Sequence, residues 1–476
     1  MCVSIGAQPA FAQGKSFEII IRYVVLQDGE SVISQLQEVV IGEIELLRTD
    51  PILQTMTFRI PSQNICEYDC VAEILEEAIQ NGELLWSESN SVGGQTGSLW
   101  VSGAGVDANG YQRQYAHDLL DLEVAHQRST GKGVLVAVVD TGIDESHEAL
   151  GSRVSPYGVS VINGYPTPYD ENSSNPEAIN ALRGHGTFVA GLISLVAPDA
   201  GLLPIRILDS EGQGSTDAAA AGIVEAVERG AHVITLAFGT PNQSLVLNQA
   251  IQYAKDSGVV VFAASGNDGE LGCYYPASNP AVMNVAACDV FDEFETTSNW
   301  CDGVDVISPG SMELVFGMVD DRKSVIGPVP GESGSSEYKA GRGTSFAVGF
   351  AAGMAALMRA QHPEWPNAET EASEIPLIIH ESMSDITSHP VIALPDNAGF
   401  RSRPSASVVT GFGPVAPGPG DVNGDGCVNS ADLGLVLASF GQQPQSPGLH
   451  LVDLDGDFVV GPSDLGMLLA LWTPCP

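Results

Sequence analysis

The chain has 476 residues and a formal net charge of −40, because 59 Asp and Glu outnumber 19 Lys and Arg. At roughly 100 to 200 residues per domain, this length predicts two to four domains. The acidic balance repels phosphate backbones and anionic lipids, so we expect no nucleic-acid partner. The longest strongly apolar stretch, residues 346–358, is shorter than the roughly 18 residues that a membrane span needs, so it predicts a buried helix and no transmembrane span.

The first residues have the form of a secretory signal. Ala10-Phe11-Ala12 before Gln13 fits a small-residue cleavage site, although no Lys or Arg precedes it and the apolar part is short. We therefore interpret residues 1–12 as the remnant of a signal peptide, the alternative being a frayed N-terminus. This interpretation predicts a secreted or cell-surface protein.

The cysteines agree with export, since thiols pair as disulfides in oxidising compartments. Their spacing leaves the pairing open, and no Cys-x-x-Cys pair indicates a zinc or redox site. They fall into three groups after the signal: Cys66 and Cys70; Cys273, Cys288 and Cys301; and Cys427 and Cys475.

Residues 13–92 have the pattern of a small α+β unit. Runs rich in β-forming residues occur at 17–26, 56–60 and 83–86, and a helix is expected at 71–80. The stretch that follows is rich in Gly and Ser, and it predicts an exposed linker over residues 93–113.

Residues 114–395 have an α/β pattern. Apolar runs at 134–139, 233–237 and 259–264 alternate with helix-like stretches such as 216–228 and 244–255. The runs are apolar throughout, which is typical of strands covered by helices on both faces. We expect a mostly parallel sheet, followed by a Pro/Gly-rich linker over 396–420.

An acidic loop occurs twice in residues 421–476, the second copy starts 32 residues after the first, and an apolar helix is expected after each. Oxygen ligands at loop positions 1, 3, 5, 7 and 12 suit a hard cation, so the loops predict calcium binding; the alternative is a pair of acidic turns. The expected ligands are Asp421, Asn423, Asp425, the Cys427 carbonyl, Asn429 and Asp432 in the first loop, and Asp453, Asp455, Asp457, the Val459 carbonyl and Asp464 in the second. Each loop keeps only the exiting helix, and the pair resembles a type I dockerin. The resemblance implies docking to a cohesin-like or cell-surface scaffold.

Four short segments of the α/β region each end an apolar run: VAVVDTGID, GHGTFVAG, AASGNDG and GTSFAVG. They carry Asp140, His185, Asn267 and Ser345. A serine hydroxyl needs an imidazole to take its proton, and the imidazolium needs a carboxylate beside it. The Asn267 amide and the Ser345 backbone N–H would stabilise the tetrahedral oxyanion. The residues thus predict acyl transfer through Ser345.

The four segments, in the order Asp, His, Asn, Ser, resemble those of the subtilisin-like serine proteases, the subtilases, over residues 114–362. The resemblance implies a three-layer α/β domain that hydrolyses peptide bonds in proteins and needs no organic cofactor. It also implies a substrate track: Leu236, Ala237, Phe238 and Gly239 pair with the peptide, Ala264 and Gly266 line a specificity pocket, and Asp268 faces that pocket. A carboxylate there would favour a basic side chain.

This chain departs from the family pattern at three positions. Phe346 stands where Met is usual, and Gly349 stands where Pro is usual and presets the helix start. Ala149 stands where relatives with a tight calcium site have Asp, so that site is not expected here.

The unit at 13–92 sits where subtilases carry an inhibitory propeptide, which implies a zymogen cut near residues 87–91; the alternative is a permanent accessory domain. We therefore expect a secreted serine endopeptidase whose calcium-binding tail docks or anchors it. The alternative function is a catalytically weak or inactive subtilase fold that acts as a calcium-dependent binding or scaffold component.

Overall fold

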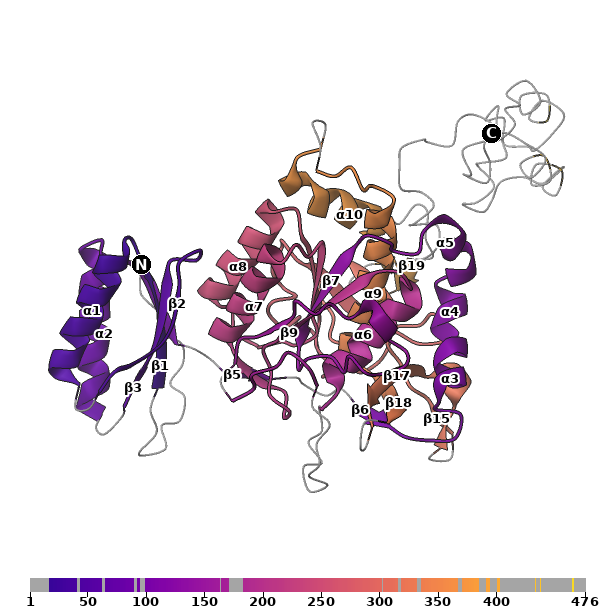
Figure 1. The fold of residues 1–476 in the computed structure, drawn as a ribbon, viewed down its shortest axis with the longest axis horizontal. Helices are drawn as coiled ribbons and strands as arrows, with labels where there is room; N and C mark the ends of the chain where they lie inside the picture. The colour runs from indigo at the N-terminus through magenta and orange to yellow at the C-terminus, as the bar shows by residue number, and fades with distance from the viewer. Residues whose placement is uncertain are drawn as a thin grey trace.

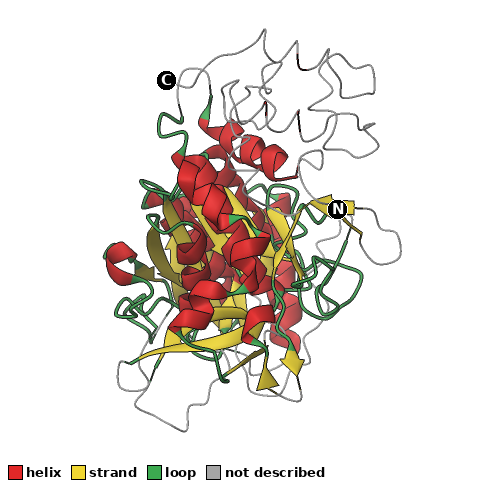
Figure 2. Ribbon diagram, turned by 90° about the vertical axis from the view of Figure 1, so that its right-hand side faces the viewer, coloured by secondary structure: helices red, strands yellow, loops and turns green. Residues whose placement is uncertain are grey.

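A computed structural model gives the fold of the chain (Figures 1 and 2). It describes residues 17–40, 43–61, 65–89, 92–94, 99–162, 164–170, 183–301, 303–315, 318–331, 335–366, 370–384, 391–393 and 400–402, and three isolated leucines at 433, 437 and 465. The expected signal remnant and every expected calcium ligand from Asp421 to Asp464 lie outside the described residues. Among the described residues, no helix is long and apolar enough to cross a membrane.

The N-terminal unit is a four-stranded antiparallel sheet, in the order β2-β3-β1-β4, covered on one face by two helices (Figure 1). Alternate residues of β1 face opposite ways: Ile19 and Ile21 pack under the helices, whereas Ile20 joins the core of the large domain. The elements are β1 (Phe17–Tyr23), α1 (Leu26–Val39), β2 (Glu45–Asp50), β3 (Thr55–Ile60), α2 (Ile65–Gln80) and β4 (Leu84–Ser89).

The large domain is built on a sheet of nine described strands, in the order β19-β20-β14-β13-β12-β11-β7-β9-β8. Its neighbouring strands are parallel except β19 and β20, so the expected mostly parallel sheet is confirmed. The strands are β7 (Leu135–Asp140), β8 (Val159–Ser160), β9 (Gly201–Arg206), β11 (Val233–Leu236), β12 (Val260–Ala264), β13 (Met283–Cys288), β14 (Val306–Pro309), β19 (Val391–Ala393) and β20 (Phe400–Ser402).

Helices cover both faces of this sheet, as Figure 2 shows. In β7, Val136 and Val138 pack with α6 and α9, whereas Ala137 and Val139 pack with α7 and α8. Both faces are therefore dry, which explains why the strand runs are apolar throughout. The helices are α3 (Ala108–Arg113), α4 (Tyr115–Leu119), α5 (Leu122–Arg128), α6 (His185–Val196), α7 (Thr216–Glu228), α8 (Leu245–Asp256), α9 (Thr344–Ala360) and α10 (Ile375–Ser384), with 3-10 turns η1 (Gly151–Arg153), η2 (Asp321–Lys323) and η4 (Ala372–Glu374).

Three small antiparallel sheets complete the described structure. They consist of β5 (Val92–Gly94) with β10 (Gln213–Ser215), β15 (Leu314–Val315) with β16 (Met318–Val319), and β17 (Val325–Pro330) with β18 (Ser336–Arg342) and β6 (Leu99–Val101). A disulfide joins Cys273 to Cys301, and Cys288 is a buried thiol.

The prediction of a linker over 93–113 is wrong from residue 99 onward, because this part is folded, although residues 102–105 and 107–109 are exposed. Residues 99–113 contain β6 and α3, and Asp107 caps α3 by accepting hydrogen bonds from Asn109 N and Gly110 N. Tyr111 is 2% exposed and its hydroxyl donates a hydrogen bond of 2.6 Å to Gly191 O. The Gly and Ser content of this stretch reflects tight turns against the domain and not free chain.

Helices α6 and α9 pack closely, which leads to a test of the fold. A Cβ at Gly353 would lie 2.6 Å from Val196 Cβ, whereas one at Gly349 would lie 3.0 Å from Leu192 Cβ. Gly353→Ala should therefore destabilise the domain by about 1–3 kcal/mol, and Gly349→Ala by less. Urea denaturation of both variants in a Ser345→Ala background, which prevents self-digestion, measures this; equal midpoints for Gly353→Ala and its parent would contradict the close packing.

Candidate active site

Asp140 ends strand β7 at the carboxyl edge of the parallel sheet. The strand before it is apolar and buried, so a rigid element carries the carboxylate to this edge. Asp140 is 1% exposed, and its Oδ1 accepts a hydrogen bond of 2.7 Å from Thr141 N. A carboxylate removed from water needs such donors.

His185 is the first residue of α6, and its imidazole lies against Asp140. Nδ1 is 2.9 Å from Asp140 Oδ2 and 3.0 Å from Oδ1, and the residue is fully buried. With Nδ1 donating to the carboxylate, Nε2 is the proton-accepting nitrogen of the neutral ring. Gly184 precedes the helix with φ of 86°, and a Cβ there would lie 2.4 Å from Pro330 Cδ. The turn that presents His185 therefore requires glycine.

Ser345 lies in the first turn of α9, beside the end of β11. Its Oγ donates a hydrogen bond of 2.9 Å to Ala237 O, and the residue is 3% exposed. The start of a helix presents backbone N–H groups and the positive end of its dipole. This position can therefore stabilise negative charge that develops next to the hydroxyl.

Asn267 follows β12 and is oriented by Thr344. Its Oδ1 accepts hydrogen bonds of 2.7 Å from Thr344 N and 3.0 Å from Thr344 Oγ1. These two donors assign the oxygen end of the amide to the start of α9, so the Nδ2 donors lie at its other end. A side-chain amide donor beside a helix start is an arrangement that can bind an oxyanion.

The residues expected along the substrate track lie at the ends of two neighbouring strands. They are Leu236, Ala237, Phe238 and Gly239 at and after the end of β11, and Ala264 and Gly266 at and after the end of β12. The N–H of Gly266 donates 3.3 Å to Thr344 Oγ1, and Ala237 accepts from Ser345. The track residues and the four candidate catalytic residues thus share one edge of the sheet.

Asp268 is exposed, and its loop is held by two neighbours. Its backbone N–H donates 2.8 Å to Asn299 Oδ1, and Asn299 Nδ2 donates 3.4 Å to Asp268 Oδ2. The hydroxyl of Tyr274 bonds to the same carboxylate, and this bond, followed by burial, raises the pKa of Tyr274. The charge of Asp268 is therefore fixed beside Asn267.

Two buried ionisable residues behind the site were not found from the sequence. Asp170 accepts hydrogen bonds from Thr187 Oγ1, 2.6 Å, and Thr187 N, 3.2 Å, in the first turn of α6. Burial raises the pKa of Asp170 to about 6, against the opposing bonds from Thr187 and Thr141. Arg206 ends β9 in register with Asp140 and is 2% exposed. Arg206 could have been identified from the sequence, because it is a charged residue at the end of an apolar run. Asp170 could not, because it follows a loop whose sequence has no periodic pattern.

The two departures beside the nucleophile have a packing explanation. The ring of Phe346 stacks on Phe188 with centroids 4.1 Å apart, and lies 5.6 Å from the His185 ring. At Gly349, a Cβ would lie 3.2 Å from Val189 O as well as near Leu192. The large ring of Phe346 thus packs on α6, and the small Gly349 lets α6 and α9 approach closely.

The loop at Ala149 is held by a side-chain cation. The guanidinium of Arg153 donates hydrogen bonds of 2.8 Å to the carbonyls of Leu150 and Pro198, and another to Ala149 O. These carbonyls already accept hydrogen bonds from the cationic Arg153 side chain. They therefore do not fit a metal ion in addition to Arg153. Within the described residues, no group of three or more His, Cys, Asp or Glu side chains could hold a metal.

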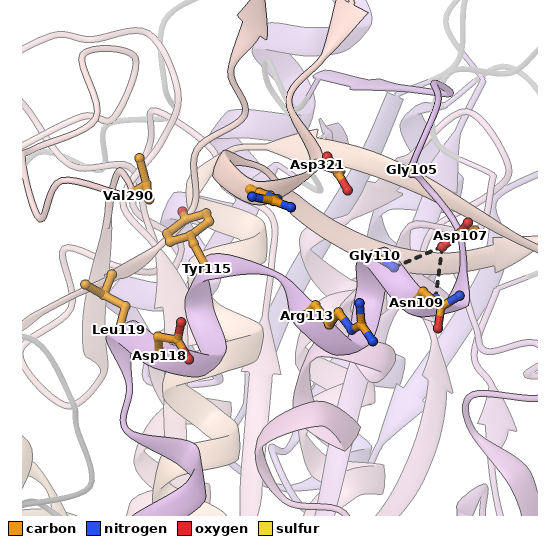
Figure 3. Close-up of a pocket in the computed structure, with 11 residues that line it drawn as sticks. Gly105, Asp107, Asn109, Gly110, Arg113, Tyr115, Asp118, Leu119, Val290 and Asp321 are labelled. Atoms are coloured by element: carbon orange, nitrogen blue, oxygen red, sulfur yellow. Dashed lines mark hydrogen bonds between the residues drawn. The ribbon is translucent and has the colours of Figure 1, made fainter.

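A cavity of about 720 Å³ lies beside α3, α4 and η2 (Figure 3). Figure 3 shows Asp107, Arg113, Tyr115 and Asp321 around it. None of Asp140, His185, Asn267 or Ser345 lines this cavity. It is therefore separate from the candidate active site.

The sequence and the fold of the chain match those of known proteins. A model of the Subtilase family matches residues 131–389. The chain is 36% identical over 255 residues to subtilisin BL of Lederbergia lenta, covering 52% of this chain and 83% of that protein. It is 34% identical over 256 residues to subtilisin E of Bacillus subtilis, covering 51% of this chain and 60% of that protein.

Among solved structures, the chain is similar to fervidolysin from Fervidobacterium pennivorans, described as a keratinolytic enzyme related to subtilisin. The TM-score is 0.63 and the identity 21%, covering 84% of this chain and 62% of that one. This likeness shows the fold. The chain spans about three fifths of fervidolysin and of subtilisin E.

The buried carboxyl of Asp170 gives a pH-dependent prediction. Because its pKa rises from 3.8 to about 6 on folding, the folded state binds the proton more tightly, and the penalty for ionising Asp170 is present above pH 6 and absent below about pH 4. Relative to the parent, Asp170→Asn should therefore gain stability as pH rises through this window, by roughly 3 kcal/mol in all. Urea unfolding at several pH values, in a Ser345→Ala background, measures the difference.

Asp118→Asn is the matched control, because the Asp118 side chain is 98% exposed. Its stability difference from the parent is the reference for removing one exposed carboxylate. A pH profile for Asp170→Asn that matches this reference would contradict the desolvation of Asp170.

Proposed function

The chain belongs to the subtilase family, and we propose that Asp140, His185 and Ser345 are its catalytic triad. It is a subtilisin-like serine peptidase, a hydrolase of peptide bonds. The observation that carries the residue assignment is the buried contact of His185 Nδ1 with both carboxylate oxygens of Asp140. That contact fixes the tautomer in which Nε2 can take a proton.

In the proposed reaction, Ser345 Oγ attacks the scissile carbonyl carbon while His185 Nε2 takes the hydroxyl proton. Collapse of the tetrahedral intermediate breaks the C–N bond, and His185 gives its proton to the departing amine. Water then attacks the acyl-enzyme ester, and its proton returns through His185 to Ser345 Oγ. Asp140 holds the ring through Nδ1 and stabilises the imidazolium that forms.

The oxyanion is assigned to Asn267 Nδ2 and the Ser345 backbone N–H. Support comes from Thr344, whose two hydrogen bonds hold the Asn267 amide in a single orientation before substrate arrives. Donors placed in advance need no reorganisation as charge develops, and removing one typically slows such reactions by about 100- to 1,000-fold.

The proposed substrate track runs along β10 and residues 236–239. Support comes from the chain itself: Val92 to Gly94 pair antiparallel with Gln213 to Ser215. An added strand on a sheet edge is how extended peptides bind by backbone pairing. We assign protein substrates to this track, with a preference for a basic side chain near Asp268.

The N-terminal unit is assigned as an inhibitory propeptide. It docks on the large domain through Ile20, Leu53 and Trp86, which pack with α7 and α8. The carboxylate of Glu88 accepts hydrogen bonds from Ser244 Oγ, 3.0 Å, Leu245 N, 2.7 Å, and Val246 N, 2.9 Å, at the start of α8. This docking delivers the chain that follows β4 to the substrate track.

The expected processing point at residues 87–91 conflicts with the pairing of β4. Ser87 and Ser89 belong to β4 and pair with Ile21 and Ile19 of β1, so their peptide bonds are part of a sheet. A bond within a sheet cannot enter a protease site without unfolding. We therefore place processing between Gly94 and Leu99, after the segment that pairs with β10.

The tail and the location remain assignments from the sequence pattern. The repeated acidic loops support calcium binding by residues 421–464, and docking to a cohesin-like or cell-surface partner follows from the dockerin-like pattern. Export is supported by the signal-like start and by the Cys273–Cys301 disulfide. The alternative of an inactive binding protein is not favoured, because all four residue types of the proposed mechanism share one edge of the sheet.

Self-processing tests the proposed function. The full chain should cut itself between Gly94 and Leu99 and react with a serine-directed fluorophosphonate, because Ser345 Oγ is activated by His185. Ser345→Ala should do neither. Intact-mass analysis locates the cut, and fluorescence of the protein band reports the label.

Ser308→Ala is the matched control, because Ser308 is a buried serine in β14. It should be processed and labelled like the parent chain. An uncut, unlabelled parent that also fails to label after an added protease removes the N-terminal unit would support the binding-protein alternative.

A further inference from the structure

An irregularity in β2 turns Arg48 toward the large domain. The pairing of β2 with β3 shifts between Leu46 and Arg48, so that Arg48 lies opposite Thr57. With regular pairing, Arg48 would lie opposite Met56, whose side chain packs under α1 and α2. A bulge that adds one residue reverses which face the following side chains take. The bulge therefore moves Arg48 to the face that meets the large domain.

Arg48 and Thr57, facing each other across the two strands, hold the two oxygens of one carboxylate. Arg48 Nε donates 2.8 Å to Asp217 Oδ2, and Thr57 Oγ1 donates 2.6 Å to Asp217 Oδ1. The Nη2 of Arg48 also donates 2.6 Å to Val161 O. Asp217 lies in the first turn of α7 and is 6% exposed, and Thr57 is 1% exposed.

We propose that the Asp217 carboxylate and the Val161 carbonyl form an arginine socket that determines which N-terminal unit the peptidase domain accepts. The partner that fits is a sheet presenting a guanidinium and a hydroxyl on adjacent strands, as Arg48 and Thr57 do. This inference rests on the proposed inhibitory role of the N-terminal unit and adds the residues that give the interface its specificity.

The chemistry of the socket selects arginine. A guanidinium is planar and presents donors in a fixed fork, so it reaches a carboxylate and a carbonyl together, whereas an ammonium is a single point charge. Removing the cation from a buried ion pair leaves an uncompensated charge and is strongly destabilising. That loss exceeds the stability that the intact pair has over an apolar contact of the same size. A unit without Arg48 therefore pays a penalty on docking.

The other contacts of the interface discriminate less between one N-terminal unit and another. Ile20, Leu53 and Trp86 contribute apolar burial, which is non-directional. Glu88 bonds to the backbone N–H groups of Leu245 and Val246, which any sequence would supply. Glu88 also accepts a hydrogen bond from Ser244 Oγ, and the Arg22 guanidinium donates to the Gln249 side-chain oxygen. Asp217 differs from these residues because it is a buried carboxylate of the large domain whose two oxygens accept from Arg48 and Thr57.

The socket lies at the end of the substrate track. Asp217 is two residues after Ser215, whose backbone pairs with Val92. Docking at the socket thus holds the N-terminal unit next to β10, where β5 of the outgoing chain pairs with that strand. Loss of the socket contact should release the β5–β10 pairing.

Hydrogen exchange of the full chain, in a Ser345→Ala background that keeps it uncut, tests the socket. Arg48→Ala and Asp217→Asn should each speed exchange of the β10 amides by about 10- to 100-fold, and the double variant should be no faster than the faster single one. Arg48→Lys should remain closer to Arg48→Ala than to the parent. Unchanged exchange of β7 and β11 amides shows that each variant is folded.

Arg59→Ala is the matched control, since Arg59 lies on the neighbouring strand β3 and pairs with Glu18 and Glu45 inside the unit. It should leave β10 exchange at the parent rate. Parent-like exchange in Arg48→Ala, or additive effects of the two socket variants, would overturn the socket. Either result stands apart from the processing test, which uses the active serine and reports on the proposed function alone.

Discussion

The hydrogen bond between His185 and Asp140 is the contact on which the rest of the active site depends. Both residues are buried at the carboxyl edge of the parallel sheet, one at the end of β7 and the other at the start of α6. Because a buried carboxylate must be paired, the sheet and helix are held at a fixed separation. Asp170 accepts a hydrogen bond from Thr187 in the same turn of α6. Ser345 and Asn267 then reach this point from α9 and β12, and Thr344 joins the two.

The N-terminal unit contacts the large domain beside the same edge of the sheet. It covers the starts of α7 and α8 with Arg48, Thr57 and Glu88, and its outgoing chain pairs with β10. Apolar packing contributes to this interface, and the proposed arginine socket adds the contact of Arg48 and Thr57 with the buried Asp217 carboxylate. In the proposed propeptide role, this docking brings the chain that follows β4 to β10, beside the proposed substrate track.

The sequence predicted those features that short segments determine. The apolar runs located β7, β11 and β12, and the helix bounds of α7 agree with the expected 216–228. The motifs named four residues that lie along one edge of the sheet, at or after β7, β12 and the starts of α6 and α9. Features set by distant contacts were missed. Arg48 and Asp217 are 169 residues apart, the bulge that turns Arg48 has no local signature, and the Cys273–Cys301 pairing was one of several open choices. Residues 99–113 were misread because Gly and Ser describe a turn and a free linker equally well.

The most direct test of the account is the pH dependence of kcat/KM for the parent and Asp140→Asn with a peptide substrate. An asparagine amide keeps the shape but can donate to His185 Nδ1, which favours the wrong tautomer. The account predicts a folded protein whose kcat/KM at neutral pH falls by about 10,000-fold. A folded variant within tenfold of the parent would contradict the central claim that the buried Asp140–His185 contact prepares Ser345 for attack.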